Sequence, residues 1–192
     1  MYCNNNPKRI LCIVGGMNAG GAETFLMKVY RAIDKKKYQM DFYVATQEEG
    51  FYDKEIISMG GKIFYSTSKS RAFFRSLTTL QSTVKKQNYN HVLRASQHSL
   101  STLDLLAARM GGAKVLVYRS SNTATGGRVV NKVLHALFKW LAIAVPTLKI
   151  APSTEAAEFM FGKNCVKHGK AIVVKNAIAV DDFLFDPDRR KK

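Results

Sequence analysis

The sequence predicts an α/β protein built on a Rossmann-like, doubly wound parallel sheet. Short apolar runs alternate along the 192-residue chain with segments whose apolar residues recur at helical spacing. Such regular alternation requires right-handed crossovers, which make neighbouring strands parallel. The first apolar run also leads through a glycine-rich turn into the first helical segment. Ligands of such sheets bind at the carboxyl ends of the strands, so the residues that directly follow each strand are the candidate site residues.

Each element follows from its local pattern. Continuous apolar runs are typical of strands buried on both faces, and they predict strands at 9–14, 40–45, 62–66, 91–96, 114–122, 148–153 and 171–176. Apolar residues at helical spacing predict helices at 22–33, 51–61, 70–87, 101–112, 127–145 and 155–163. The fifth helix is expected to stop at Pro146, and Ser153 or Thr154 is expected to cap the sixth.

Composition narrows the class of protein. Apolar content is ordinary at 46%, which predicts a soluble globular domain. The three cysteines are too few and too widely spaced for a disulfide framework or a zinc site, which favours a reducing, cytoplasmic compartment. The start of the chain lacks the apolar segment of a signal peptide, and the longest apolar run is too short to cross a bilayer.

The charge is strongly positive and unevenly distributed. Thirty Lys and Arg stand against 14 Asp and Glu, a net charge of +16. Between residues 56 and 154 fourteen residues are Lys or Arg, and Asp104 is the single acid. Such a field implies an anionic partner, which can be nucleic acid, anionic lipid or a phosphorylated substrate. A generic solubilising surface is the alternative.

Four glycines crowd the turn after the first strand: Gly15, Gly16, Gly20 and Gly21. A Walker A loop would need Lys and Ser or Thr after the last glycine, but Ala22 and Glu23 stand there. A dinucleotide fingerprint would need the G-x-G-x-x-G spacing and an acid after the second strand, and neither is present.

What remains is a glycine loop at a helix N-terminus, where free N–H groups and a positive dipole end attract a charged group. Glu23 lies in the first helical turn, where it can accept a hydrogen bond from a ligand hydroxyl. A tight turn followed by a helix-stabilising carboxylate is the alternative. We expect a positive φ at Gly20 or Gly21, which would strain any larger residue there.

The stretch "RILCIVGGMNAGGAETFLMKVYRAID" resembles the opening of retaining GT-B glycosyltransferases of the group 1 / family 4 type, which build exopolysaccharides and capsules. The segments "GFYDKEIISMGGKIFY", "APSTEAAEFMFGK" and "IVVKNAIAVDDFLFDP" resemble the same family in the same order. The resemblance implies two Rossmann-like domains with the active site between them. Residues 1–178 then form the N-terminal, acceptor-side domain, and residues 179–192 begin the linker toward a C-terminal donor-binding domain. The Glu-x7-Glu signature of that second domain does not occur here, so this chain alone is expected to be inactive.

The resemblance also implies partners and site residues. The partners are a nucleotide-sugar donor, held mainly by the other domain, and a lipid-linked or saccharide acceptor; no cofactor and no metal are expected. The glycine loop would lie against the donor diphosphate and the acceptor. Further candidate ligands follow two strands where relatives carry histidines, and they are Arg94, Arg119, Ser121 and Asn122.

His98 is the candidate base or acceptor ligand because it is the only histidine at a predicted strand end on the ligand side. Glu23 is the second catalytic candidate. For His98 the alternative is a capping or surface histidine, and for Arg119 it is a structural partner of Asp104 or of a carbonyl. An NAD- or nucleotide-binding Rossmann protein and a non-catalytic anion-binding domain are the competing functions.

Basic residues beside aromatic ones predict a membrane-facing surface. They are Lys69, Arg71 and Arg75 near one helix start, and Arg128, Lys132 and Lys139 on a stripe that also holds His135. Such patches attract anionic lipid, so the domain is expected to bind the inner membrane face peripherally. A solvated helix face is the alternative. No segment resembles a nucleic-acid-binding motif, and no nucleic acid partner is expected.

Overall fold

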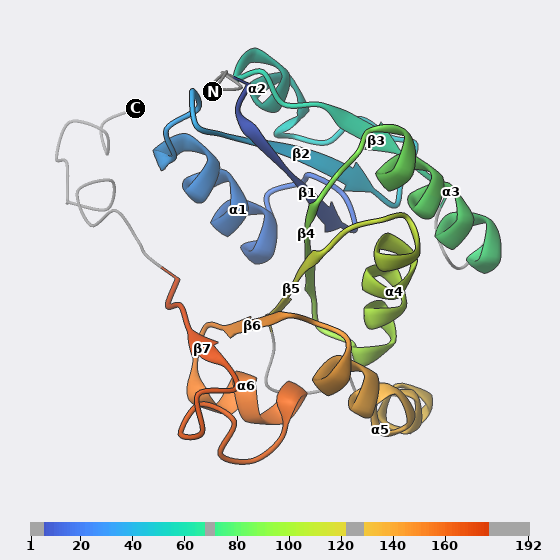
Figure 1. Ribbon diagram of the computed structural model, residues 1–192, viewed down its shortest axis with the longest axis vertical. Coiled ribbons are helices and arrows are strands. Elements are labelled where there is room, and N and C mark those ends of the chain that lie inside the picture. The colour runs from blue at the N-terminus through green and yellow to red at the C-terminus, as the bar shows by residue number, and fades with distance from the viewer. Residues whose placement is uncertain (1–5, 68–71, 122–128, 177–192) are drawn as a thin grey trace, which may run out of the picture.

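The computed structural model describes residues 6–67, 72–121 and 129–176. Their strands form one seven-stranded sheet in the order β3-β2-β1-β4-β5-β6-β7, and every pair in it is parallel (Figure 1). The doubly wound parallel sheet predicted from the alternating pattern is confirmed. The order reverses direction at β1, so the ends of β1 and β4 lie beside each other at the topological switch point.

The elements lie close to their predicted positions. The strands are β1 (Lys8–Val14), β2 (Tyr38–Val44), β3 (Ile63–Tyr65), β4 (His91–Ser96), β5 (Val115–Ser120), β6 (Leu148–Ala151) and β7 (Ile172–Val173). The helices are α1 (Gly21–Ala32), α2 (Asp53–Ser58), α3 (Phe73–Lys86), α4 (Thr102–Met110), α5 (Val129–Ala144) and α6 (Thr154–Phe161), with the 3₁₀ turn η1 (Ser99–Ser101) before α4. Ser153 caps α6, since its Oγ accepts from the Ala156 N–H at 3.2 Å.

Alternate residues of the strands build a separate core on each face of the sheet. Leu11 and Ile13 of β1 pack with buried residues of α3, α4 and α6, whereas Cys12 and Val14 pack with α1 and α2. Figure 1 shows α1 on one side of the sheet and α3 and α4 on the other. Both layers leave the carboxyl edge of the sheet open, and this is where α1 begins.

Helix α5 packs differently from the other long helices, and the residues of its predicted basic stripe differ in exposure: Lys132 is exposed, whereas His135 is buried. It contacts η1, α4 and α6, and of its described side chains only His135 and Ala142 are buried. The predicted basic stripe does not face solvent as a unit, because His135 is 8% exposed and stacks on Phe159 at 4.4 Å. Lys139 of the same stripe is half-buried, with Nζ 6.0 Å from the centre of that ring. The outer face of α5 is apolar instead.

Candidate functional site

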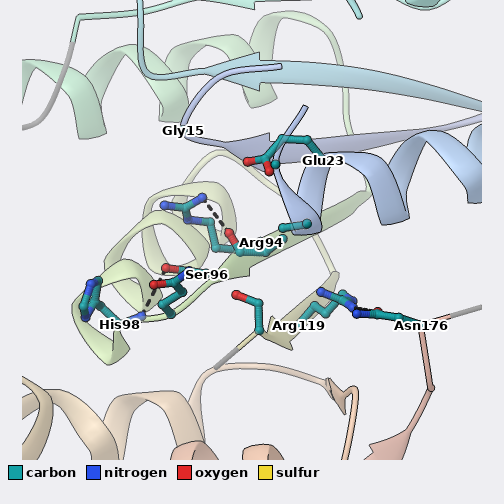
Figure 2. Close-up of a pocket in the computed structure, with 13 residues that line it drawn as sticks. Gly15, Glu23, Arg94, Ser96, His98, Arg119 and Asn176 are labelled. Atoms are coloured by element: carbon teal, nitrogen blue, oxygen red, sulfur yellow. Dashed lines mark hydrogen bonds between the residues drawn. The ribbon is translucent and has the colours of Figure 1, made fainter. Parts of the chain in front are cut away.

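A cleft of about 470 Å³ opens at the carboxyl edge of the sheet, where a ligand site was expected (Figure 2). Its walls come from the glycine loop and the start of α1, from the ends of β4 and β5, and from the segment after β7. The lining residues are Gly15, Gly20, Gly21, Ala22, Glu23, Arg94, Ala95, Ser96, Gln97, His98, Arg119, Ser121 and Asn176. The topology therefore brings together side chains that lie far apart in the sequence.

The glycine loop forms one wall with bare backbone. A Cβ added to Gly15 or Gly21 would meet no atom within 4 Å, so a side chain at either position would occupy the cleft. The expected positive φ is wrong: Gly20 is extended at φ −85°, and Gly21 starts the helix without a positive φ. The requirement for glycine here comes from open ligand space, and not from backbone strain.

Glu23 lies above this loop in the first turn of α1. A Cβ on Gly20 would collide with its carboxylate, so the missing side chain of Gly20 is what lets Glu23 fold back along the loop. Figure 2 shows Glu23 on the opposite side of the cleft from Arg119. The carboxylate can therefore accept a hydrogen bond from a ligand hydroxyl, but it also repels an anion placed directly beside it.

Arg94 lies in the cleft wall with its charge already paired. Its Nε is 2.8 Å from Oδ2 of Asp104, and the two side chains are 12% and 3% exposed. Nη1 donates to the carbonyls of Ile13 and Ala95, each at 2.9 Å, and Nη2 donates to Ser101 Oγ at 3.3 Å. Arg94 therefore joins β1, β4 and α4, and it offers a ligand little uncompensated charge.

Arg119 is placed very differently. It is 1% exposed, its guanidinium carbon lies 3.9 Å from the centre of the Phe25 ring, and Nη2 donates to Asn176 Oδ1 at 2.6 Å. Among the residues that the structure describes, no carboxylate lies within ion-pair distance of it. Asp104, the partner considered from sequence, pairs with Arg94. Burial lowers the pKa of Arg119 from its ordinary value, but a guanidinium remains a cation at neutral pH.

His98 is held by its backbone at the far end of the cleft. Its N–H donates to Ser96 Oγ at 3.3 Å, and its carbonyl accepts from the Tyr118 hydroxyl at 2.7 Å. Ser96 in turn donates to Ser101 Oγ at 2.8 Å. These contacts fix the main chain of His98, while its half-buried side chain carries none of them. The imidazole is thus held at the cleft rim and is open to a ligand.

Most of the residues that line the cleft were predicted as site residues from the sequence, and a few were missed. Gly16 does not line the cleft, and a Cβ on it would meet Thr46 Cγ2 at 3.5 Å. Asn122 lies outside the described residues, as do Lys69, Arg71 and Arg128 of the predicted basic surface. Asn176 was missed, although it follows the last strand and the rule used for the other strands points to it. Ser96 and Gln97 lie between predicted site residues and were also not singled out as ligands.

The described part of the chain offers neither a metal site nor a helix that could span a membrane. No group of three or more His, Cys, Asp or Glu in that part of the chain is arranged to hold a metal ion. No described helix has the length and apolar character needed to cross a bilayer.

The sequence of the chain is similar to that of a curated protein. No protein-family profile matches the chain. It is 32% identical over 191 residues to EpsF of Bacillus subtilis (strain 168), which carries the provisional name of a glycosyltransferase. Over almost its whole length, the chain is similar to a glycosyltransferase. The match covers 96% of this chain and 48% of EpsF, so the chain spans about half the length of that curated relative.

Solved structures share the fold at low identity. MnaA from S. aureus, solved with UDP, superposes with a TM-score of 0.63 at 16% identity, over 94% of this chain and 48% of MnaA. MurG from Acinetobacter baumannii superposes with a TM-score of 0.59 at 12% identity, over 90% of this chain and 46% of MurG. These matches show the Rossmann-like fold, and each again corresponds to about half of the longer protein.

Proposed function

We propose that this chain is the acceptor-binding domain of a retaining glycosyltransferase, which transfers a sugar from a nucleotide-sugar donor to a lipid-linked or polysaccharide acceptor. The observation that carries the proposal is the cleft itself. It combines a bare glycine wall at a helix N-terminus with a buried cation that lacks a described carboxylate partner. Similarity to EpsF along the same residues supports sugar transfer as the reaction class.

The two halves of the cleft suit different parts of such a reaction. The N–H groups at the start of α1 and the guanidinium of Arg119 stabilise a phosphate or another anionic group. Glu23 and His98 are suited to bind acceptor hydroxyls, since both present polar atoms at the rim. The donor nucleotide would contact mainly the half of the family's length that this chain does not cover.

The proposed reaction is a single transfer. The acceptor hydroxyl oxygen forms a bond to the anomeric carbon of the donor sugar on the same face from which the phosphate departs, so the configuration is retained while the bond from that carbon to the phosphate oxygen breaks. The electron pair leaves with the nucleoside diphosphate, and His98 takes the hydroxyl proton. Negative charge develops on the departing phosphate, where preorganised N–H groups and a fixed cation stabilise it without reorganising.

The test uses the protein extended to the full length of its relatives. It is incubated with UDP-, GDP- and ADP-sugars and a bacterial lipid extract, and release of nucleoside diphosphate is followed together with labelled product. Transfer from one donor is expected, and it should be lost in Gly21→Val with the melting temperature unchanged. Tight NAD binding with no transfer from any donor would instead favour the nucleotide-binding alternative.

A further inference from the structure

Asn176 lines the cleft, but the proposed function gives it no role. It lies just after β7, and Figure 2 shows its side chain next to Arg119. Its Oδ1 accepts from Nη2 of Arg119 at 2.6 Å. The backbone of the segment is held up to Val174, whose N–H donates to the Ala151 carbonyl at 2.8 Å. Within the described residues, Arg119 is therefore what holds the Asn176 side chain at the cleft.

The chemistry of Arg119 decides which end of the Asn176 amide faces it. A guanidinium donates hydrogen bonds and accepts none, so the amide oxygen must lie against it. The NH2 group then lies on the other side of the same planar amide, in a residue that lines the cleft. In the part of the chain that the structure describes, the contact with Arg119 is the one hydrogen bond of this amide. Two N–H donors therefore remain for a ligand beside a buried cation.

Charge is divided between the two sides of the cleft. Figure 2 shows Glu23 across the cleft from Arg119, so an anionic group is repelled on one side and attracted on the other. Arg119 also lies over Phe25, which comes one helical turn after the start of α1 at Gly21. The guanidinium, the Asn176 amide and the free N–H groups at the start of α1 therefore line neighbouring parts of the cleft.

We propose that Asn176 and Arg119 bind one phosphoryl group together, with Nδ2 of Asn176 and the guanidinium donating to different oxygens of it. A phosphoryl group directs its oxygens tetrahedrally, which suits donors from separate elements, whereas both oxygens of a carboxylate lie in one plane. The inference rests on the proposed function, because it adds a ligand residue to the same cleft. The phosphoryl group belongs either to the donor diphosphate or to a phosphorylated acceptor, which share this chemistry.

Calorimetry with inorganic pyrophosphate tests whether Asn176 donates to the ligand. Asn176→Ala removes the amide and leaves Arg119 without this partner. Binding should weaken about tenfold, as the loss of a hydrogen bond to a charged group requires. Equal or tighter binding would mean that Asn176 only occupies Arg119, and it would overturn the proposal. Asn90→Ala is the matched control, since Asn90 is exposed just before β4 at the opposite edge of the sheet; it should bind within about twofold of wild type.

Asn176→Asp tests whether Asn176 and Arg119 act on the same group. Aspartate keeps the oxygen that faces Arg119, but it has no N–H and it neutralises the cation. Pyrophosphate affinity should fall further than in Asn176→Ala, while the melting temperature stays equal or rises because a carboxylate now pairs with Arg119. Asn90→Asp carries the same change of charge as a control. Wild-type affinity in Asn176→Asp would contradict the proposal.

The NH2 group of Asn176 also gives a direct spectroscopic signal. In the ¹⁵N-labelled chain, its side-chain resonances are identified by their absence from the spectrum of Asn176→Asp. Pyrophosphate should shift them in step with the calorimetric binding curve, because the N–H groups gain an anionic acceptor. Resonances that stay in place at saturating pyrophosphate would overturn the proposal even if the variants bind more weakly.

Three further ligands identify the source of the phosphoryl group. UDP carries the leaving group of a donor, glycerol 3-phosphate carries a phosphomonoester as an acceptor could, and acetate carries a carboxylate alone. A loss in Asn176→Ala confined to UDP assigns the pair to the donor, and a loss for glycerol 3-phosphate assigns it to the acceptor. Acetate that binds as tightly as pyrophosphate would overturn the phosphoryl assignment. Because no transfer is measured, an extended protein that transfers no sugar while these losses hold would count against the proposed function alone.

Discussion

Arg119 lies over the ring of Phe25, with its guanidinium carbon 3.9 Å from the ring centre. Phe25 comes from the helix that starts at the glycine loop, and Arg119 comes from the end of β5. The aromatic face holds the cation in place without neutralising it, since the attraction is weaker than that of a carboxylate. The cleft therefore keeps a buried positive charge available for an anionic ligand.

Arg119→Met should separate ligand binding from stability. The charge-assisted hydrogen bonds of a guanidinium contribute about 1.5–3 kcal/mol, so inorganic pyrophosphate should bind roughly ten- to hundredfold more weakly. The melting temperature should stay equal or rise, because a desolvated cation is removed while the side-chain volume is largely kept. Calorimetry and thermal unfolding measure both effects. Arg109→Met is the control, as Arg109 donates to the Val145 carbonyl outside the cleft lining; equal pyrophosphate affinity in both variants would count against the assignment.

Arg94 and Asp104 should behave as a structural pair. Arg94→Met removes the cation from a nearly buried ion pair, and breaking such a pair costs about 3–5 kcal/mol of unfolding free energy. Adding Asp104→Asn to that variant should recover part of the loss, because the buried carboxylate that faced Arg94 is replaced by a neutral amide. Urea unfolding of the two single variants and the double variant gives the coupling energy. Additive losses would show that the two charges do not interact.

The two glycines nearest α1 should differ in their effects. Gly21→Ala places a methyl group into open cleft space, so it should weaken ligand binding and leave unfolding free energy within about 1 kcal/mol of wild type. Gly20→Ala instead displaces the Glu23 carboxylate, and it should mimic Glu23→Gln in a transfer assay. Unchanged turnover in Glu23→Gln would restrict Glu23 to stabilising the helix start.

His135 should make the domain less stable in mild acid. Burial, the largest cause, lowers the pKa of His135 below its ordinary value of 6.5. Below pH 6.5 the unfolded chain therefore binds a proton that the folded chain rejects, so stability falls as the pH drops through that range. Thermal unfolding between pH 5 and pH 8 should show a smaller decline in His135→Phe, whose ring can keep the stack on Phe159. Parallel curves for the two proteins would contradict this origin of the pH dependence.

The sequence predicted the sheet well because each strand is a continuous apolar run and each crossover carries an apolar helical period. It also led to the cleft, since reading the residues after each strand reaches Arg94, His98 and Arg119. The sequence could not show that Arg94 pairs with Asp104 and that Arg119 does not. Which of them meets Asp104 depends on how α4 packs against β4. The side of α5 that faces solvent could not be predicted from the sequence either, because apolar residues occur around most of this helix and only its packing buries His135 and exposes Trp140.

The most direct test of the account is steady-state sugar transfer by the protein extended to the full length of its relatives, comparing wild type with Arg119→Met. We predict that the loss of this charged contact raises the KM for the acceptor or lowers the turnover number at least about tenfold. Thermal stability should be preserved. The KM for the donor should change less than the turnover number, because the other half would hold most of the donor and Arg119 would act mainly on the charge that develops on the departing phosphate. Wild-type kinetics in Arg119→Met, or an effect confined to the KM for the donor, would contradict the claim that this cleft is the acceptor side of a glycosyltransferase.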